Sequence, residues 1–193
     1  MHSTKTRLAA SMVVLGALVA VSTSAVAAPT DAAVTAGTLA FTAAPAVATS
    51  FTAVALNGTA QTTTAGIGAF TVNDFTGTGA GWRVTAQGTQ FKQYDSAANS
   101  GTGGYVTSGR TLAASSLTLS APTVTANGTT SGLPAVAGGT LDSTNAVAIA
   151  TAIAGNGMGK YDFTPTTMTL SVPASAYAAT YRSDVTVSVV SGP

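Results

Sequence analysis

The side chains that most often carry out catalysis are scarce in this sequence. The chain has no cysteine, and its single histidine, His2, stands near the N-terminus in a segment interpreted below as a leader. The sequence also contains no glutamate. Ser-His-Asp and Cys-His catalysis and zinc sites built from His or Cys are therefore excluded for the rest of the chain. A Ser-x-x-Lys dyad is missing too, because neither Lys92 nor Lys160 has a serine three positions before it.

Aspartates are the remaining candidates for acid–base or metal chemistry, and there are 6 of them. A glycosidase needs two carboxyl groups about 5 Å or about 6.5–9.5 Å apart, and nothing in the sequence pairs two of these aspartates. Asp95 and Asp142 each stand in a glycine-rich loop, where an aspartate can bind calcium or cap a turn. Because there is no Asp-x-Asp-x-Asp run, turn capping is the favoured role. We therefore expect no enzyme, no cofactor and no metal.

Aromatic side chains offer a different chemistry, which is stacking on a sugar ring or on a partner. Trp82 is the only tryptophan, and it can be either a core anchor or a contact on the rim of a site. It shares a strand face with Val84 and Ala86, which favours the core. Tyr94 and Tyr105 stand in a polar, glycine-rich segment, so they are the better candidates for exposed aromatic residues.

The stretch from Phe70 to Phe91 is the part of the chain around which the rest is arranged. Large and small residues alternate on both sides of a glycine-rich segment, a pattern typical of strands with one buried face. Gly77, Gly79 and Gly81 permit the positive φ that a turn between strands needs. They do not indicate a phosphate loop, because neither Lys-Ser/Thr nor a helix follows. We therefore predict a hairpin-like strand–turn–strand unit here.

The fold class predicted from the whole sequence is all-β, a single-domain β-sandwich or barrel of roughly nine short strands. Asn57-Gly58 and Asn127-Gly128 predict type I′ hairpin turns rather than glycosylation sites. The alanine-rich run 145–154 is compatible with a helix, but its alternation and the glycine after it favour a strand. The segments expected as strands are 37–42, 50–56, 60–65, 70–74, 82–86, 112–119, 123–125, 145–154, 161–163, 168–172 and 180–189. The segments expected as loops are 92–109, which can also be a ragged hairpin, and 129–143.

The N-terminus has the features of a secretory signal peptide. A basic start is followed by the apolar run 8–21 and by Ala25-Val26-Ala27, which fits a cleavage site. We expect 1–27 to be cleaved, 28–36 to be a flexible lead, and 37–193 to form the domain. No other apolar run approaches about 18 residues, so no membrane span is expected.

Charge is sparse, at 7% of the residues against about 25% in a typical soluble domain. Without a basic stripe, nucleic acid is not an expected partner. Abundant threonine and valine favour sheet. Because lysine is nearly absent, few charged side chains are available to keep strand edges from pairing with another chain. One functional hypothesis is therefore a structural or assembly subunit of a surface layer or filament.

Two groups of residues carry a resemblance to a known family. Asp74 is followed by Thr76-Gly77-Thr78-Gly79-Ala80-Gly81-Trp82-Arg83-Val84. Near the C-terminus stand Gly157-Met158-Gly159, Leu170-Ser171-Val172-Pro173-Ala174, Tyr177-Ala178-Ala179-Thr180-Tyr181 and Ser191-Gly192-Pro193. Both groups resemble signatures of the WxL-domain family of Gram-positive surface proteins, over about 37–193. The family prefers leucine where Val84 stands, and Val187-Ser188-Val189 takes the place of its second Trp-x-Leu.

The resemblance implies a secreted, non-catalytic surface protein that associates non-covalently with cell-wall peptidoglycan. It also implies other surface proteins as further partners, and one alternative is a protein that only binds another surface protein. The expected location is the cell wall and cell surface. The candidate ligand-binding residues are Trp82, Val84, Asp74, Tyr94 and Tyr105, with Val187 and Val189 as the second-motif positions.

Overall fold

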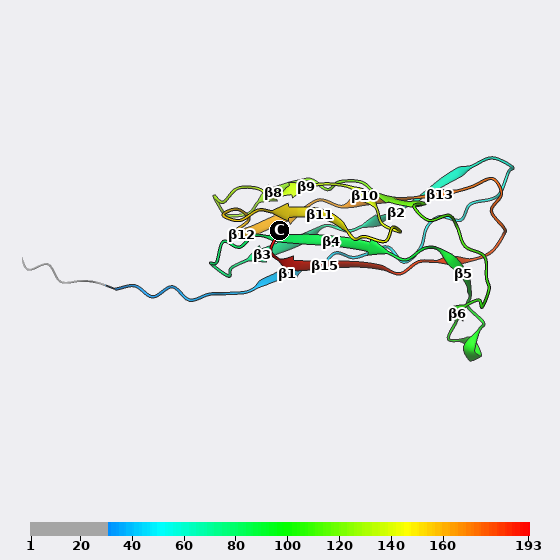
Figure 1. The fold of residues 1–193 in the computed structure, drawn as a ribbon, viewed down its shortest axis with the longest axis horizontal. Coiled ribbons are helices and arrows are strands. Elements are labelled where there is room, and N and C mark those ends of the chain that lie inside the picture. The colour runs from blue at the N-terminus through cyan, green and yellow to red at the C-terminus, as the bar shows by residue number, and fades with distance from the viewer. Residues whose placement is uncertain (1–30) are drawn as a thin grey trace, which may run out of the picture. The chain divides into compact units, whose positions relative to one another are not determined.

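The computed structural model describes residues 31–193, so the expected signal peptide, 1–27, lies outside the described residues. The regular secondary structure of the unit from Thr35 to Pro193 consists almost entirely of antiparallel strands, as Figure 1 shows. The predicted all-β, sandwich-like fold is confirmed. The predicted number of strands was wrong: the described residues form β1 to β15 rather than nine strands. The number is higher because short strands form inside the expected loops and one expected strand is broken in two.

Three four-stranded sheets surround the core, and a smaller fourth sheet follows the order β14-β5-β6. The first sheet has the order β1-β3-β12-β8, with bounds Leu39–Ala43, Phe70–Asp74, Gly159–Phe163 and Val124–Ala126. The second has the order β10-β7-β13-β2, with bounds Gly139–Thr140, Leu117–Leu119, Thr166–Val172 and Gln61–Ile67. The third has the order β15-β4-β11-β9, with bounds Val185–Ser191, Trp82–Gly88, Val147–Ala152 and Ala135–Val136. The fourth sheet has the bounds Tyr181–Arg182, Lys92–Asp95 and Gly104–Tyr105, and the 3-10 turn η1 (Asn99–Gly101) lies between β5 and β6.

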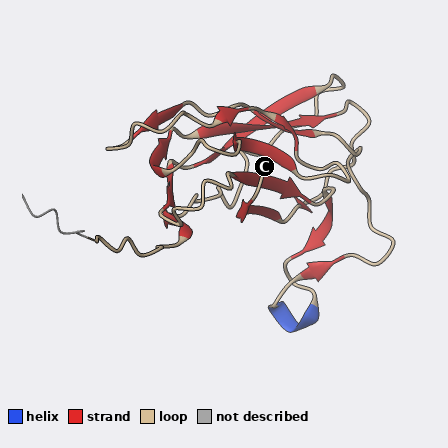
Figure 2. Cartoon of the chain, turned by 60° about the vertical axis from the view of Figure 1, so that its left-hand side comes forward, coloured by secondary structure: helices blue, strands red, loops and turns tan. Residues whose placement is uncertain are grey.

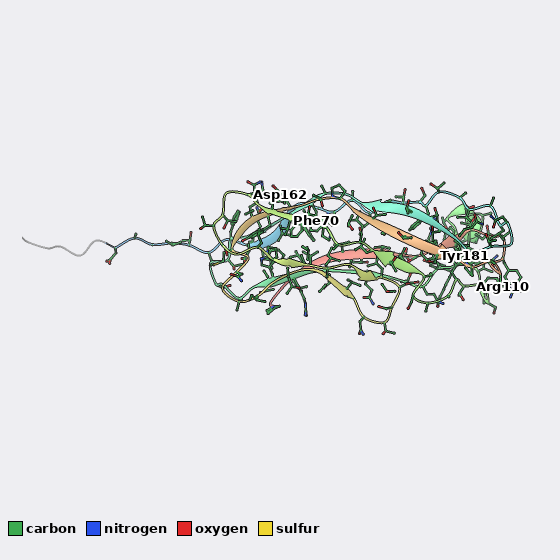
Figure 3. All side chains as sticks on the ribbon, turned by 90° about the horizontal axis from the view of Figure 1, so that it is seen from above. Phe70, Arg110, Asp162 and Tyr181 are labelled. Atoms are coloured by element: carbon green, nitrogen blue, oxygen red, sulfur yellow. The ribbon has the colours of Figure 1, made fainter. Side chains whose placement is uncertain are left out.

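The core lies where the inward faces of the three large sheets meet. The ring of Trp82, in β4, lies 6.0 Å from the ring of Tyr161 and 6.4 Å from that of Phe163, both in β12. Phe163 in turn stacks on Phe70 of β3, with ring centroids 4.5 Å apart. Figure 3 shows Phe70 within the unit, whereas Asp162, the neighbour of Phe163, lies at its edge. Alternation in β12 therefore puts aromatic rings inside and the carboxylate outside, as a period of two requires.

The predicted hairpin-like unit over 70–91 was wrong in its pairing. β3 and β4 are strands, but they belong to different sheets. The glycines between them do adopt positive φ, 67° at Gly77, 63° at Gly79 and 77° at Gly81. This loop carries the chain from one sheet to another. Each strand pairs instead with C-terminal strands, β3 with β12 and β4 with β15.

The strand predicted over 50–56 does not form, and the two Asn-Gly turns are not type I′ hairpins. The segment is held by side chains of β2, because Thr63 donates to the carbonyl of Thr52 at 2.8 Å and Gln61 donates to that of Ala55 at 2.8 Å. Only the glycine of each Asn-Gly pair has positive φ, at Gly58 and Gly128. A type I′ turn needs positive φ at both central residues.

The strand predicted over 180–189 is broken into β14 and β15. At the break, the backbone N–H of Asp184 donates to the hydroxyl of Thr89 at 3.0 Å, and the hydroxyl of Ser183 donates to the carbonyl of Thr89 at 2.5 Å. These side-chain bonds replace ladder bonds and let β14 leave the sheet of β15. The strand predicted over 112–119 is also shorter than expected, because only β7 forms there. The strand in 145–154 and the ragged hairpin in 92–109 are confirmed, as β11 and as β5 with β6.

Candidate functional site

The side chains of the first motif lie inside the fold. Trp82 is 0% exposed, and its indole Nε1 donates to the carbonyl of Gly157 at 2.8 Å. Val84 is also 0% exposed. Asp74 is 4% exposed, and its Oδ1 accepts from the backbone N–H of Thr76 at 3.1 Å and from the hydroxyl at 2.6 Å. The interpretation of Trp82 as a core anchor is confirmed, and Asp74 caps the loop that follows β3.

The second motif lies directly beside the first. In the β15–β4 ladder, Val187 is the partner of Ala86 and Val189 is the partner of Val84. Beyond β15, the N–H of Gly192 donates to the carbonyl of Gly81 at 2.9 Å. Both valines are half-buried and pack against the core. The two motifs, distant in sequence, therefore form one structural unit, and contact between these side chains and a ligand stays a prediction.

Tyr94 and Tyr105 lie elsewhere, on an arm formed by β5, η1 and β6. Figures 1 and 2 both show this arm projecting from the strands of the large sheets. The two tyrosines are ladder partners, and their rings meet edge to face at 5.7 Å and 83°. Tyr105 is 45% exposed. The structure thus separates the predicted site residues into a buried or half-buried motif group and an aromatic pair in which Tyr94 is half-buried and Tyr105 is exposed.

Charged side chains of β14, of β5 and of the link between β14 and β15 join this aromatic pair. The guanidinium carbon of Arg182 lies 3.5 Å from the centroid of the Tyr94 ring. Lys92 is the direct ladder partner of Arg182, and directly opposed residues share a face of an antiparallel pair. The hydroxyl of Tyr105 donates to Oδ2 of Asp184 at 2.6 Å. We call this surface, made of Lys92, Tyr94, Tyr105, Arg182 and Asp184, the arm face.

Tyr105 and Asp184 are electrostatically linked. Burial of the phenol raises the pKa of Tyr105 above its ordinary value, and the hydrogen bond to Asp184 raises it further. The positive charge of Arg182 acts in the opposite direction. The phenol therefore stays protonated and keeps donating to the carboxylate throughout the neutral range.

The opposite face of the same small sheet carries a second, separate set of side chains. Arg110 lies over the ring of Tyr177, with its guanidinium carbon 3.8 Å from the centroid. Tyr181, the ladder partner of Gln93, donates its hydroxyl to the carbonyl of Tyr177 at 3.1 Å. Figure 3 labels Arg110 and Tyr181 near the same end of the unit. This face matches the arm face in residue types, which makes it a useful internal control.

A groove of about 720 Å³ adjoins the arm face, and most of the residues that line it have polar side chains. Asp184 belongs to both, because it lines the groove and accepts the hydrogen bond from Tyr105. The other polar side chains that line the groove are Gln87, Thr89, Gln90, Ser115, Asp142, Ser143, Thr144 and Thr186. Amide and hydroxyl groups that continue from an aromatic surface are suited to an extended polar ligand.

Backbone strain gathers near the arm. The non-glycine residues with positive φ in the described part of the chain are Asn99, Ser100, Ser108 and Ser115. Positive φ is costly for residues with a side chain and persists where the surroundings enforce it, often at binding sites. All four fall between β5 and β7.

Sequence reasoning found the aromatic pair but missed its charged partners. Arg182 and Lys92 come from segments that were expected to be a long strand and a loop. The available signal was composition, because tyrosine recurs at 94, 105, 177 and 181 in segments that also carry three of the basic residues. No sequence pattern indicated that these segments pair with each other.

Within residues 31–193, no group of three or more His, Cys, Asp or Glu side chains is arranged to hold a metal ion. No described helix is long and apolar enough to cross a membrane. The buried Asp142 is fully used in the fold, where its two oxygens accept from the backbone and hydroxyl of Ser116 and from the backbone of Leu117 at 2.9–3.0 Å. Asp142 thus joins its loop to the start of β7 by bonds to residues far away in the sequence, rather than capping a local turn as predicted.

The fold and the site describe an all-β domain with two adjoining motifs and a projecting aromatic arm, and comparison with known proteins assigns its family. The family model of the WxL domain, described as surface cell wall-binding, matches residues 29–193. The chain therefore belongs to the WxL family of cell wall-binding surface domains. Neither the curated proteins nor the solved structures contain a significant match.

Proposed function

We propose that this protein is a secreted, non-catalytic domain that binds peptidoglycan non-covalently through its arm face. The observation that carries the proposal is the Tyr94–Tyr105 pair on a projecting arm, in which Tyr105 is exposed and Arg182 lies over the ring of Tyr94. The family assignment supplies the cell wall as the target. The arm face supplies aromatic and charged side chains that can contact the glycan of the cell wall.

The arm face combines two properties that suit a sugar chain. A tyrosine ring offers a flat apolar surface with a polar tip, and the apolar face of a pyranose ring can stack on such a surface. The adjoining groove offers amide and hydroxyl groups that exchange hydrogen bonds with sugar hydroxyls. Because the groove and the rings share Asp184, one extended strand can contact both.

In this proposal the motif residues act by holding the fold. Trp82 has no exposed surface, so its ring supports the sandwich rather than stacking on a ligand. Val187 and Val189 fill the ladder beside it. The absence of the second motif's tryptophan is then compatible with wall binding, because the ligand contacts come from the arm.

A second function, assembly into a surface layer or filament, is favoured by one observation. β15 is an edge strand of seven residues without a charged side chain, and Val190 in it is 39% exposed. Unprotected edge strands can pair with another chain. Concentration-dependent oligomers without wall material would support this function, and a monomer at all concentrations would reject it.

The test of wall binding is co-sedimentation of residues 28–193 with peptidoglycan that has been stripped of teichoic acid. Tyr105→Ala should weaken binding about three- to tenfold, which corresponds to the loss of one aromatic contact. Tyr177→Ala is the matched control, because Tyr177 is 57% exposed on the opposite face. Tyr105→Phe keeps the ring and should retain most of the binding. Equal binding by Tyr105→Ala and Tyr177→Ala, with both folded, would reject the arm face, and failure of the wild type to sediment would reject wall binding.

A further inference from the structure

The arm face carries an unusual pairing of like charges. Lys92 and Arg182 are direct ladder partners in the β5–β14 pair. Directly opposed like charges destabilise an antiparallel pair. Both side chains are exposed, in a protein where charged residues make up only 7% of the sequence.

The groups around this pair leave it with positive charge. Arg182 stacks on Tyr94, an arrangement that leaves the N–H edge of its planar guanidinium free for a bidentate partner. Asp184 is the nearby acid on the same face, and its Oδ2 already accepts the hydroxyl of Tyr105. Two cations against one partly occupied carboxylate give the arm face a net positive charge.

We propose that Lys92 and Arg182 bind a carboxylate carried by the glycan strand, while the exposed ring of Tyr105 stacks on its sugars. This inference rests on the proposed function and specifies the ligand of the same surface. A carboxylate between the two cations relieves their mutual repulsion and accepts charge-assisted hydrogen bonds from both. In peptidoglycan glycan strands, the muramic acid residues carry such a group wherever the peptide has been removed.

The charge pattern favours a carboxylate over a dense polyanion. The arm face holds two cations with Asp184 beside them. A polyphosphate with closely spaced charges would place further anions near this aspartate, at a cost in repulsion. A single carboxylate per disaccharide avoids this repulsion.

The experiment measures binding to glycan strands freed of peptide, with their carboxylates either free or converted to neutral amides. The wild type should bind the acidic strands about five- to tenfold more tightly than the amidated ones. This difference should shrink as salt is added, because exposed charges are screened. Arg182→Gln and Lys92→Gln should each reduce affinity for the acidic strands more than affinity for the amidated strands.

Arg110→Gln is the matched control, because Arg110 also stacks on an exposed tyrosine but on the opposite face. If thermal melting shows that Arg182→Gln unfolds the arm, Lys92→Gln is the variant that tests the proposal. Equal wild-type affinity for the acidic and amidated strands would overturn the carboxylate assignment and leave glycan binding standing. Tighter binding to soluble teichoic acid than to the acidic strands would also overturn it. Failure to bind either form of strand would overturn the proposed function itself.

Discussion

Trp82 is the residue whose replacement should most clearly separate fold from function. The indole is fully buried, and its N–H donates to the carbonyl of Gly157. In Trp82→Phe this buried carbonyl loses its partner, at about 1–3 kcal/mol. The smaller ring also gives up roughly 1–2 kcal/mol of buried apolar contact. We therefore expect the free energy of unfolding to fall by about 2–5 kcal/mol, within the limit of about 3–5 kcal/mol for truncation to alanine.

The assay is thermal and denaturant unfolding followed by far-ultraviolet circular dichroism, since the substitution removes the only tryptophan. For a domain of this size the expected loss lowers Tm by about 4–20 °C. Val190→Ala, at an exposed edge position, serves as the control and should change stability by less than about 0.5 kcal/mol. Below its melting point, folded Trp82→Phe should still bind peptidoglycan. A stability equal to the wild type, or a folded variant that no longer binds, would refute this account of Trp82.

Two further predictions concern carboxylates with defined partners. Asp142→Asn places an amide N–H₂ group opposite N–H and O–H donors, including those of Ser116. The free energy of unfolding, measured with denaturant, should therefore fall by about 1–3 kcal/mol. An unchanged unfolding midpoint would contradict the role of Asp142 as the hydrogen-bond acceptor at the start of β7. The pKa of Tyr105 is raised by burial and by its bond to Asp184, so its contribution to stability is present below the ordinary tyrosine pKa and is lost as pH rises through the higher, folded value. Ultraviolet titration of tyrosinate should therefore show one tyrosine shifted toward its ordinary pKa in Asp184→Asn, and no shift would contradict the link.

Local patterns predicted the individual strands well, because alternation depends only on neighbouring residues. The face shared by Trp82, Val84 and Ala86 is buried as expected, and the glycines before it have positive φ. The alanine-rich run around Ile149 forms a strand because its neighbours β4 and β9 supply ladder partners. These features follow from side-chain period and backbone freedom, which can be read from sequence.

Pairing was less predictable, because it joins segments that are far apart in the chain. Nothing near Asp74 indicates that β3 pairs with β12 rather than with β4. The break at Asp184 is also invisible in sequence, since it depends on bonds from Thr89. Arg182 was missing from the predicted site for the same reason, because only the pairing of β14 with β5 brings it beside Tyr94.

The central claim, that the arm face is the ligand-binding surface, is tested most directly by nuclear magnetic resonance. Backbone amide shifts of residues 28–193 would be followed during titration with soluble glycan fragments of peptidoglycan. The account predicts shifts concentrated at Tyr94, Tyr105 and Arg182 and extending into the groove at Gln87. Shifts that cluster instead around the loop from Asp74 to Trp82 would contradict it and place the ligand at the motifs.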